Sequence, residues 1–588
     1  MSHWLKTLAV AALPAAALSG CVDDKYDLSD VDTTTRITVN DLVVPVNIDE
    51  IRLSDIIAPD ADSKIKVVTI DGKEFYALSE TGSFGSDAIR VDNITAAAPA
   101  LNPTVETLAL HPGMRADYDG TSTYGIEPMG NDFSYRDDGV DEAIVEVFSV
   151  RTKPVTFNIH LTAKDVDAVA EKIAFSDLVI SVPKGLTAEA SEGVYDAATG
   201  LWTIAEHEVA GTESDISLTA TAIDLRANGS GIAADHSLTL SGAFRVESGL
   251  LTIVAKRDAQ GVPVQLPASL EFAADYTLGD LEVTAFAGTI EYTLEGMDIA
   301  PVDITDIPDF LNDPATNLLI DNPQLYLQLN NPVADNGLGY RAGIELHALR
   351  EDAPTLDFVP DGPIEVGFEH GVAGPYNVVL APSQDALTTP EAFKANLGYV
   401  AFPTLDGLLG SAEGAAASGL PEQIGVSIVS PCIPRQSVSD FALGTDIPGV
   451  EGRYELLAPL ALKDGSVIVY SEKETGWSSE DLDAVTITRL ECRVDVTNSI
   501  PLNASLVAYP LDKDGRRMHG VEVKAQEVKA NCTDAPLTIE MTGEVRYLDG
   551  IEFVATVHGA GVETLAPSQT ISLKNIRACV SGWYEKEL

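Results

Sequence analysis

The chain has 588 residues, of which 45% are hydrophobic and 22% charged, so it can bury several cores and is not wholly disordered. A chain of this length has room for about three to five domains of ordinary size. The formal net charge of −53 at pH 7 argues against nucleic acid and anionic lipid surfaces as partners, because both would repel the chain. Apart from the N-terminal leader, no apolar run is long enough to cross a bilayer as a helix.

The leader holds the clearest motif of the chain. Lys6 is followed by residues 8–18, which are almost wholly Leu, Ala and Val, and then by Ser19, Gly20 and Cys21. A basic start and a short apolar core are typical of a secretory signal peptide. Leu-Ser-Gly-Cys resembles the lipobox of bacterial lipoproteins, which implies cleavage before Cys21, a diacylglycerol on its thiol and an acylated amine. Two or more acyl chains make such anchoring effectively permanent.

We therefore expect residues 1–20 to be a lipoprotein signal peptide and Cys21 to be the lipidated residue. The alternative is an ordinary signal peptide with an accidental cysteine. Residues 21–35 then form an acidic, solvated tether. The tether carries the following acidic residues: Asp23, Asp24, Asp27, Asp30 and Asp32.

Acidic residues directly after the lipidated cysteine resemble the signal that sends lipoproteins of the Bacteroidota to the outer cell surface. The resemblance implies an outer-membrane protein that faces the cell exterior, with a periplasm-facing position as the alternative. The acidity of the whole chain also fits a soluble protein held at high density on a surface.

Segment 36–141 is predicted to be an N-terminal β domain with a long loop. Ile65–Ile70 and Phe75–Leu78 flank Asp71-Gly72, and such a two-residue link between apolar runs predicts a tight hairpin. Residues 51–57 are interpreted as one helical turn or a short edge strand. Residues 118–141, rich in Gly, Asp, Ser and Tyr with little periodicity, are predicted to be a loop or linker.

Segment 142–300 is predicted to be a β-sandwich domain, because apolar residues alternate with polar ones from Val155 to Leu161. One short helix is expected at 165–174, where apolar residues take helical spacing. Segment 301–430 is predicted to be a β domain with short helices, one at 389–396 and one, or a linker, at 405–420.

Segment 431–588 is predicted to be a C-terminal β-sandwich domain, with Asp-Gly turns at 464–465, 514–515 and 549–550. Strands at short, regular spacing, only rarely broken by helix, indicate sandwiches or partly open barrels. The predicted fold class is therefore mainly β, with tandem β-sandwich domains, immunoglobulin-like or related, and a few short helices.

Several stretches look like parts of large uncharacterised surface lipoproteins of the Bacteroidota. The stretches are 24–33, 307–311, 322–323 and 494–501. The resemblance implies tandem β domains over most of the chain. It carries no reaction, so no catalytic residue is transferred to this sequence.

The remaining cysteines all lie in the last third of the chain: Cys432, Cys492, Cys532 and Cys579. In an exported chain an even number permits two disulfides, in one of three connectivities. No pair has the Cys-x-x-Cys spacing of a zinc or redox site. Free buried thiols are the alternative, since large domains do not need disulfides.

No catalytic motif is found. Gly-x-Ser-x-Gly, His-Glu-x-x-His and the phosphate-binding glycine motifs are absent, and isolated histidines such as His160 and His558 are interpreted as structural. A glycosidase carboxylate pair leaves no sequence spacing to find, so that class stays open. We predict a protein that is not an enzyme.

Residues 117–141 are the preferred region for a ligand. Four rings there are candidates for stacking on a sugar: Tyr118, Tyr124, Phe133 and Tyr135. No cofactor is expected apart from Ca²⁺, for which three carboxylates there are candidates: Asp132, Asp137 and Asp138. A second aromatic candidate is Trp583-Tyr584. For all these rings the alternative is that they close the end of a sandwich.

The sequence thus predicts a lipid-anchored surface protein with a non-catalytic binding or adhesion role. Its partner would be a glycan or a surface protein, with no nucleic acid. The alternatives are a polysaccharide-degrading surface enzyme and a structural subunit of a surface assembly.

Overall fold

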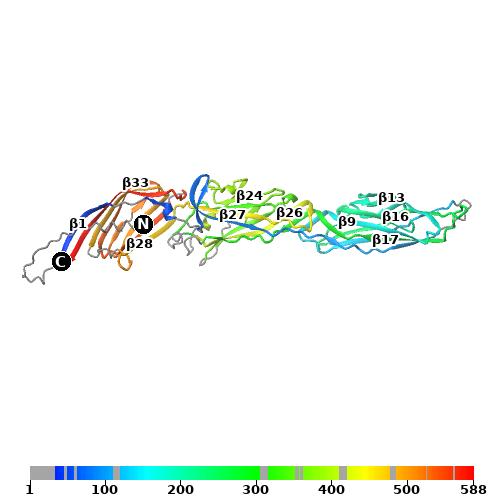
Figure 1. Ribbon diagram of the computed structural model, residues 1–588, viewed down its shortest axis with the longest axis horizontal. Coiled ribbons are helices and arrows are strands. Elements are labelled where there is room, and N and C mark those ends of the chain that lie inside the picture. The colour runs from blue at the N-terminus through cyan, green and yellow to red at the C-terminus, as the bar shows by residue number, and fades with distance from the viewer. Residues whose placement is uncertain are drawn as a thin grey trace, which may run out of the picture.

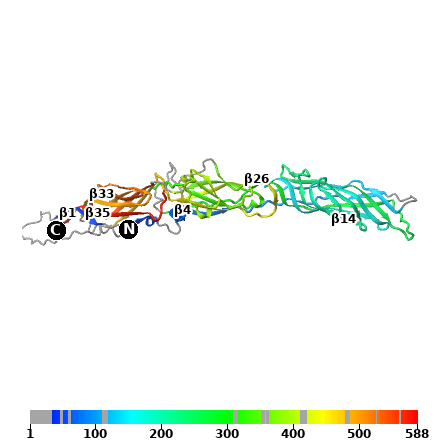
Figure 2. The same ribbon diagram turned by 90° about the horizontal axis from the view of Figure 1, so that it is seen from above.

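The computed structural model is an elongated rod with three sections along its long axis (Figure 1). It describes residues 34–45, 50–57, 63–109, 119–304, 307, 316–350, 356–357, 362–409, 420–476, 485–524, 526–559 and 563–587. We call 34–57 with 467–587 the terminal section, 63–94 with 294–462 the middle section, and 95–293 the distal section. Figure 2 shows the same linear order from a second direction. In the described part of the chain, no helix is long and apolar enough to cross a bilayer.

The terminal section contains two sheets. The first contains β1 (Thr34–Pro45), β2 (Ile51–Arg52), β29 (Val485–Asn498), β31 (Glu522–Lys524), β33 (Cys532–Arg546) and β35 (Thr570–Glu587). The second contains β28 (Val467–Glu474), β30 (Leu502–Leu511), β32 (Gln526–Val528) and β34 (Gly550–Gly559).

A six-stranded sheet belongs to the middle section alone. It contains β3 (Ile65–Ile70), β4 (Lys73–Gly85), β20 (Gln324–Leu329), β24 (Tyr376–Ala381), β25 (Leu397–Ala401) and β27 (Glu451–Pro459). The short helical segments are α2 (Leu53–Ile56), η2 (Ala334–Asn336), η3 (Glu391–Phe393) and α3 (Leu405–Leu408).

The distal section is a sandwich of two sheets, one of which continues into the middle section. The seven-stranded sheet contains β7 (Thr121–Gly125), β8 (Met129–Asp137), β10 (Ala170–Ser181), β12 (Val194–Asp196), β13 (Leu201–Glu208), β15 (Gly231–Ile232) and β16 (Leu238–Ala255). The distal strands of the twelve-stranded sheet are β5 (Thr95–Ala96), β6 (Thr104–Ala109), β9 (Ile144–Lys164), β11 (Leu186–Ala190), β14 (Glu213–Asp224), β17 (Ser269–Leu278) and β18 (Leu281–Thr293). Its strands in the middle section are β19 (Val302–Asp303), β21 (Arg341–Leu349), β22 (Leu356–Asp357), β23 (Ile364–Gly367) and β26 (Gln423–Ala442).

These sheets confirm the predicted class, mainly β with few short helices. The Asp71-Gly72 hairpin is also confirmed. β3 and β4 pair up to Ile70 and Lys73, and the two turn residues take φ of 51° and 75°. Positive φ at both positions is the conformation that a two-residue turn between twisted strands requires. At 51–57 the structure combines both predicted forms, since β2 is followed directly by α2.

The helix predicted at 165–174 is wrong. β9 ends at Lys164, the N–H groups of Val169 and Ala170 both point to the carbonyl of Val166, and β10 begins at Ala170. One turn with helical spacing therefore reverses the chain, and strand pairing then takes over. Of the helix predicted at 389–396, only the short 3-10 helix η3 is present. Within 405–420 the structure contains α3, and residues 410–419 lie outside the described residues.

The loop predicted at 118–141 is also wrong over its described part. β7 and β8 both pair with β16, and β8 alternates exposed and inward positions along its length. The alternation was hidden because small or polar residues such as Ser122 and Asn131 occupy several of the less exposed positions. Tyr118 lies outside the described residues.

The chain runs from the terminal section to the distal tip and back again. β1 pairs antiparallel with β35, from Thr34 opposite Glu587 to Pro45 opposite Arg577, so the first and last strands lie together at one end of the rod (Figure 1). Strands within predicted segment 36–141 consequently enter four different sheets. The boundaries at 141, 300 and 430 stay predictions, but sheet membership does not follow them.

Backbone pairing crosses the junction between the middle and distal sections. β26 pairs with β21 over its first half and with β18 over its second half. β9 in turn pairs with β18 near its start and with β14 and β17 farther along. Staggered strands therefore carry one sheet from section to section, without an intervening linker.

The core is continuous as well. One cluster of buried hydrophobic residues extends from Leu53 and Leu565 in the terminal section, through Leu327 in the middle, to Ile253 in the distal section. A hinge would need a break in this core. The rod is therefore expected to move as one stiff unit.

Candidate functional site

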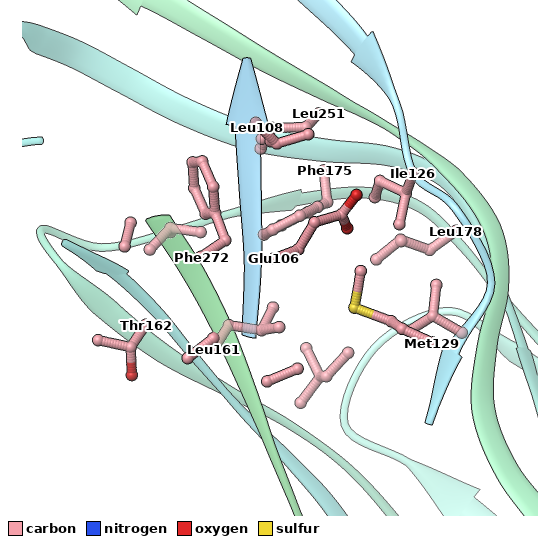
Figure 3. Close-up of a pocket in the computed structure, with 16 residues that line it drawn as sticks. Glu106, Leu108, Ile126, Met129, Leu161, Thr162, Phe175, Leu178, Leu251 and Phe272 are labelled. Atoms are coloured by element: carbon pink, nitrogen blue, oxygen red, sulfur yellow. The ribbon is translucent and has the colours of Figure 1, made fainter. Parts of the chain in front are cut away.

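An apolar cavity lies between the two sheets of the distal section and encloses about 40 Å³ (Figure 3). Its walls come from both sheets, with Leu161 of β9 and Phe272 of β17 on one side and Phe175 of β10 and Leu251 of β16 on the other. A cavity of roughly 150 Å³ is needed to hold a benzene ring. In this conformation the cavity admits only a few atoms, which excludes a sugar ring from it.

The carboxyl group of Glu106 is the ionisable group among the residues that line this cavity. Glu106 lies on β6, the outermost strand beside β17, and its side chain projects among Phe175, Ile126 and Leu178 (Figure 3). Burial among these apolar groups, and secondarily the charge of Glu127, raise the pKa of Glu106. Glu106 therefore keeps its proton to a higher pH than an exposed glutamate does.

Two of the predicted stacking rings belong to the core. Phe133 and Tyr135 are 6% and 1% exposed, and the Tyr135 hydroxyl donates to the carbonyl of Gly279 at 2.5 Å. Edge-to-face contacts join Phe133 to Tyr135 and to Phe157, with ring centroids 5.8 and 5.9 Å apart. Buried rings cannot stack on a ligand at the surface, so Phe133 and Tyr135 are core residues of the sandwich. Tyr124 is half-buried against the same core.

The three predicted Ca²⁺ ligands are engaged with protein donors. Arg245 donates to Asp132 at 2.5 Å, and Arg136 donates to Asp138 at 2.5 Å. Asp137 accepts from the N–H groups of Thr95 and Gly139 at 2.7 and 2.8 Å. Among the residues that the structure describes, no group of three or more His, Cys, Asp or Glu is placed to hold a metal ion.

Cys432, Cys532 and Cys579 are free in the structure, in agreement with the free-thiol alternative to disulfides. Cys432 lies on β26 in the middle section, whereas Cys532 and Cys579 lie on β33 and β35 in the terminal section. Of Cys492 only the backbone position on β29 is described. Cys21, the predicted lipidation site, lies outside the described residues.

Buried charges in the terminal section were missed by sequence reasoning. Glu552 is only 6% exposed and accepts from Arg517 at 2.6 Å and from Ser471 at 3.1 Å. The Arg517 hydrogen bond is the main cause that lowers the pKa of Glu552. Glu491, 5% exposed, is held between Arg489 and Arg493 on the same strand. The partners of Glu552 come from other segments of the chain, so no sequence spacing marks them, whereas the partners of Glu491 lie two residues away on its own strand.

Trp583, the second aromatic candidate, lies at the strand pair that closes the rod. The Arg36 guanidinium lies 4.0 Å from the centre of its ring and also pairs with Glu585 at 2.7 Å. A cation on the ring face joins β1 to β35. One face of the Trp583 ring is therefore engaged by a side chain of the same section.

Neither a protein-family model nor a curated protein matches the chain. Among solved structures it is similar to a "putative secreted protein" of Parabacteroides distasonis, with a TM-score of 0.35 and 15% identity over 52% of this chain and 90% of that chain. Two further structures are the triple jelly roll and turret assembly of an archaeal virus and the Sulfolobus turreted icosahedral virus. Their TM-scores are 0.09 and 0.08, at 9% and 8% identity, over 84% and 83% of this chain and 90% and 91% of theirs. Scores this low carry no argument about fold or function.

Proposed function

We propose that the protein is a stiff, lipid-anchored rod on the outer cell surface that makes a non-catalytic binding contact with its distal section. The observation that carries this proposal is the pairing of β1 with β35 at one end of a rod whose core is continuous and whose middle and distal sections share one sheet. An anchor before β1 would hold that end at the membrane. The distal section would then be the part presented outward.

The dimensions support a spacer role. β9, β26 and β35 have 21, 20 and 18 residues. At about 3.3 Å per residue each strand spans roughly 60–70 Å. With the middle and terminal sections placed end to end, the distal section lies on the order of 100 Å from the anchored end.

The tether supports the same orientation. Twelve residues, 22–33, separate Cys21 from the first residue of β1. A chain of that length spans at most about 40 Å even when fully extended. The terminal section would therefore stay near the membrane while the distal section cannot reach it.

The geometry offers less to the enzyme alternative. A polysaccharide-degrading site needs a cleft with two facing carboxylates and room for a sugar. The cavity at Glu106 encloses about 40 Å³, and a second, open hollow of about 300 Å³ has Asp165 and Glu271 among its lining residues on the sheet surface. Neither of these two hollows combines depth, space and a carboxylate pair.

A protein partner fits the distal surface better than a glycan. Phe133 and Tyr135 are withdrawn into the core, while three valines are more than half exposed: Val105 at 57%, Val194 at 69% and Val262 at 56%. Val105 and Val194 lie on β6 and β12, which are outer strands of their sheets. Exposed apolar side chains beside unpaired strand edges suit contact with another protein chain.

The test uses protein beginning at Val22, so that no lipid is attached, incubated with whole cells and crosslinked. Val105→Lys and Val194→Lys should each reduce crosslinking several-fold. Val67→Lys on β3 in the middle section, where the wild-type side chain is 44% exposed, is the matched control and should change nothing. The same protein is scored on a panel of polysaccharides. Released oligosaccharide would contradict the non-catalytic proposal, and retention without release would replace the protein partner by a glycan.

A further inference from the structure

Three side chains at the rim of the distal core form a continuous hydrogen-bonded chain. Nδ1 of His207 lies 2.9 Å from Oε2 of Glu192, and Nε2 of His207 lies 2.9 Å from Oγ of Ser214. His207 comes from β13 in one sheet, Ser214 from β14 in the other, and Glu192 from the segment between β11 and β12. His207 is 5% exposed, whereas Glu192 is 45% exposed.

The positions of the protons on His207 follow from which of its two partners can donate a hydrogen bond and which can only accept one. An ionised carboxylate only accepts, so Nδ1 of His207 carries the hydrogen and donates it to Glu192. Nε2 is then left as an acceptor for the Ser214 hydroxyl. This order, hydroxyl to Nε2 and Nδ1–H to carboxylate, is the arrangement that activates a serine nucleophile.

Packing holds this arrangement in place. The indole N–H of Trp202, a fully buried residue, donates to the Glu192 carbonyl at 2.7 Å and fixes the segment that carries the carboxylate. His207 lies directly opposite Phe175 on β10, and Ser214 lies directly opposite Leu161 on β9. Cross-strand pairs share one face of a sheet, so the serine and the imidazole lie beside these two apolar side chains.

Those two neighbours also form walls of the apolar cavity described above (Figure 3). Val209, two residues after His207, and Ile216, two residues after Ser214, line the cavity as well. Ser214 and His207 do not themselves line this space of about 40 Å³, but each has two neighbours that do. A space of this size matches an acetyl group or a similarly short acyl chain.

A backbone donor is available beside the serine. The N–H of Ser217 bonds to Ser191 on the β11 side of β14, and successive residues of an antiparallel strand alternate the direction of their N–H groups. The N–H of Asp215, the residue after Ser214, therefore faces the same side. Pairing of β11 with β14 stops at Ala190 opposite Leu218, so this N–H faces the open strand edge.

We propose that Ser214, His207 and Glu192 form a hydrolytic site for short-chain carboxylic esters, such as O-acetyl groups. Ser214 Oγ attacks the ester carbonyl while its proton passes to Nε2 of His207, and the Asp215 N–H faces the developing oxyanion. The carbon–oxygen bond to the alcohol breaks, and the alcohol leaves with the proton from Nε2. Water then attacks the acyl-serine, gives a proton to Nε2, and the carboxylic acid leaves as Oγ regains that proton. Glu192 acts as a positioning residue that keeps the imidazole in the required tautomer.

This site is independent of the proposed surface contact, because binding through the valine edges requires no turnover. It would give the rod a second activity near the same end. A hydrolysed acetyl ester would come from whatever acetylated material lies within reach of the distal section.

The test is covalent labelling of the full chain from Val22 with methanesulfonyl fluoride, whose methyl group matches the size of the cavity, followed by peptide mapping. The proposal expects one sulfonyl adduct on Ser214. Wild-type mapping identifies the residue even if a variant fails to fold. Ser181, half-buried on β10 and bonded to Glu247 at 2.7 Å, is the control serine, since a carboxylate partner without histidine should leave it unlabelled.

Hydrolysis of p-nitrophenyl acetate provides the second readout. Ser214→Ala should reduce turnover to the buffer background, and Ser181→Ala should leave it unchanged. Glu192→Gln should lower kcat by about tenfold or more and change the pH profile, which a purely structural role would not do. Absence of an adduct on Ser214, labelling of Ser181 to the same extent, or equal turnover by Ser214→Ala would overturn the proposal.

Discussion

The backbone N–H of Tyr76 donates to the carbonyl of Leu565 at 2.8 Å, and the N–H of Leu565 donates to the carbonyl of Leu460 at 2.9 Å. The N–H of Leu460 closes this ring by donating to the Tyr76 carbonyl at 2.8 Å. Strand β4 and two segments far from it in sequence thus meet where the middle and terminal sections join. Backbone hydrogen bonds cross this junction, which is why we treat the rod as stiff.

Leu565 is 3% exposed at this junction, so its replacement tests the stiffness argument. Leu565→Ala should cost about 2–5 kcal/mol of unfolding free energy, because it leaves a cavity in the shared core. Val67→Ala, at a position 44% exposed, should change it by less than about 0.5 kcal/mol. Urea unfolding followed by fluorescence and circular dichroism measures both. Separate transitions for the sections in wild-type protein would contradict a continuous core.

Glu106 predicts a pH dependence of stability. Its pKa is raised in the folded chain, so the folded state binds more protons than the unfolded state between the two pKa values. Stability is therefore greatest below the unfolded pKa and falls as pH rises through the folded pKa. Glu106→Gln should stabilise the protein at about pH 8 and have little effect at about pH 4. Urea midpoints at both values test this, and an equal effect at both would contradict it.

Glu552 predicts the opposite sign. The pKa of Glu552 is lowered in the folded protein, chiefly by Arg517. The ionised carboxylate therefore stabilises the folded state above the pKa of the unfolded state, and this stabilisation is lost as the pH falls through the pKa of the folded state. Glu552→Gln should cost about 1–3 kcal/mol near pH 7, with a smaller difference at low pH. Glu544→Gln, whose side chain is 51% exposed beside Arg546, should cost under about 1 kcal/mol. Equal losses in thermal or urea unfolding would show that burial of Glu552 has no consequence.

In the β3–β4 turn, the cost of backbone strain to stability can be measured separately from packing. An added Cβ at Gly72 meets no atom within 4 Å, yet the residue has φ of +75°. Gly72→Ala should therefore cost about 1–2 kcal/mol through backbone strain alone. Gly231 has equally open surroundings without a positive φ, so Gly231→Ala is the matched control and should be nearly neutral. A neutral Gly72→Ala in chemical denaturation would contradict the turn geometry.

The free cysteines predict that reductant leaves stability unchanged. Thiol titration of unfolded protein without reductant should detect at least Cys432, Cys532 and Cys579. Unfolding midpoints with and without reductant should agree. Fewer than three reactive thiols would indicate a disulfide.

What could be predicted from the sequence was local. The Asp71-Gly72 hairpin depends on two turn residues and their neighbours, and the alternation from Val155 to Leu161 marks one buried face of β9. β7 and β8 were missed because polar and small residues fill positions that face inward near a sheet edge. The pairing of β1 with β35 joins the two ends of the chain, and no local pattern carries that information.

The same limit applies to the candidate sites, because the sequence shows residue types but not which residues the fold brings together. Phe133 and Tyr135 were singled out for their ring type, but a ring alone does not distinguish a recognition face from a core. Glu192, His207 and Ser214 were passed over because they lie on different elements and match no motif spacing. Their relation exists only once the two sheets pack together.

The height of the distal section above the membrane tests directly whether the protein stands on the cell surface as a stiff rod. A fluorophore would be placed by an unnatural amino acid at exposed Gln260, in the turn after β16, and in a second protein at Lys513, in the turn after β30. Energy transfer to a dye in the outer membrane of intact cells is then measured for each. A stiff rod held at its terminal section should give strong transfer from Lys513 and almost none from Gln260. Equal transfer from both positions would contradict a stiff rod held at its terminal section.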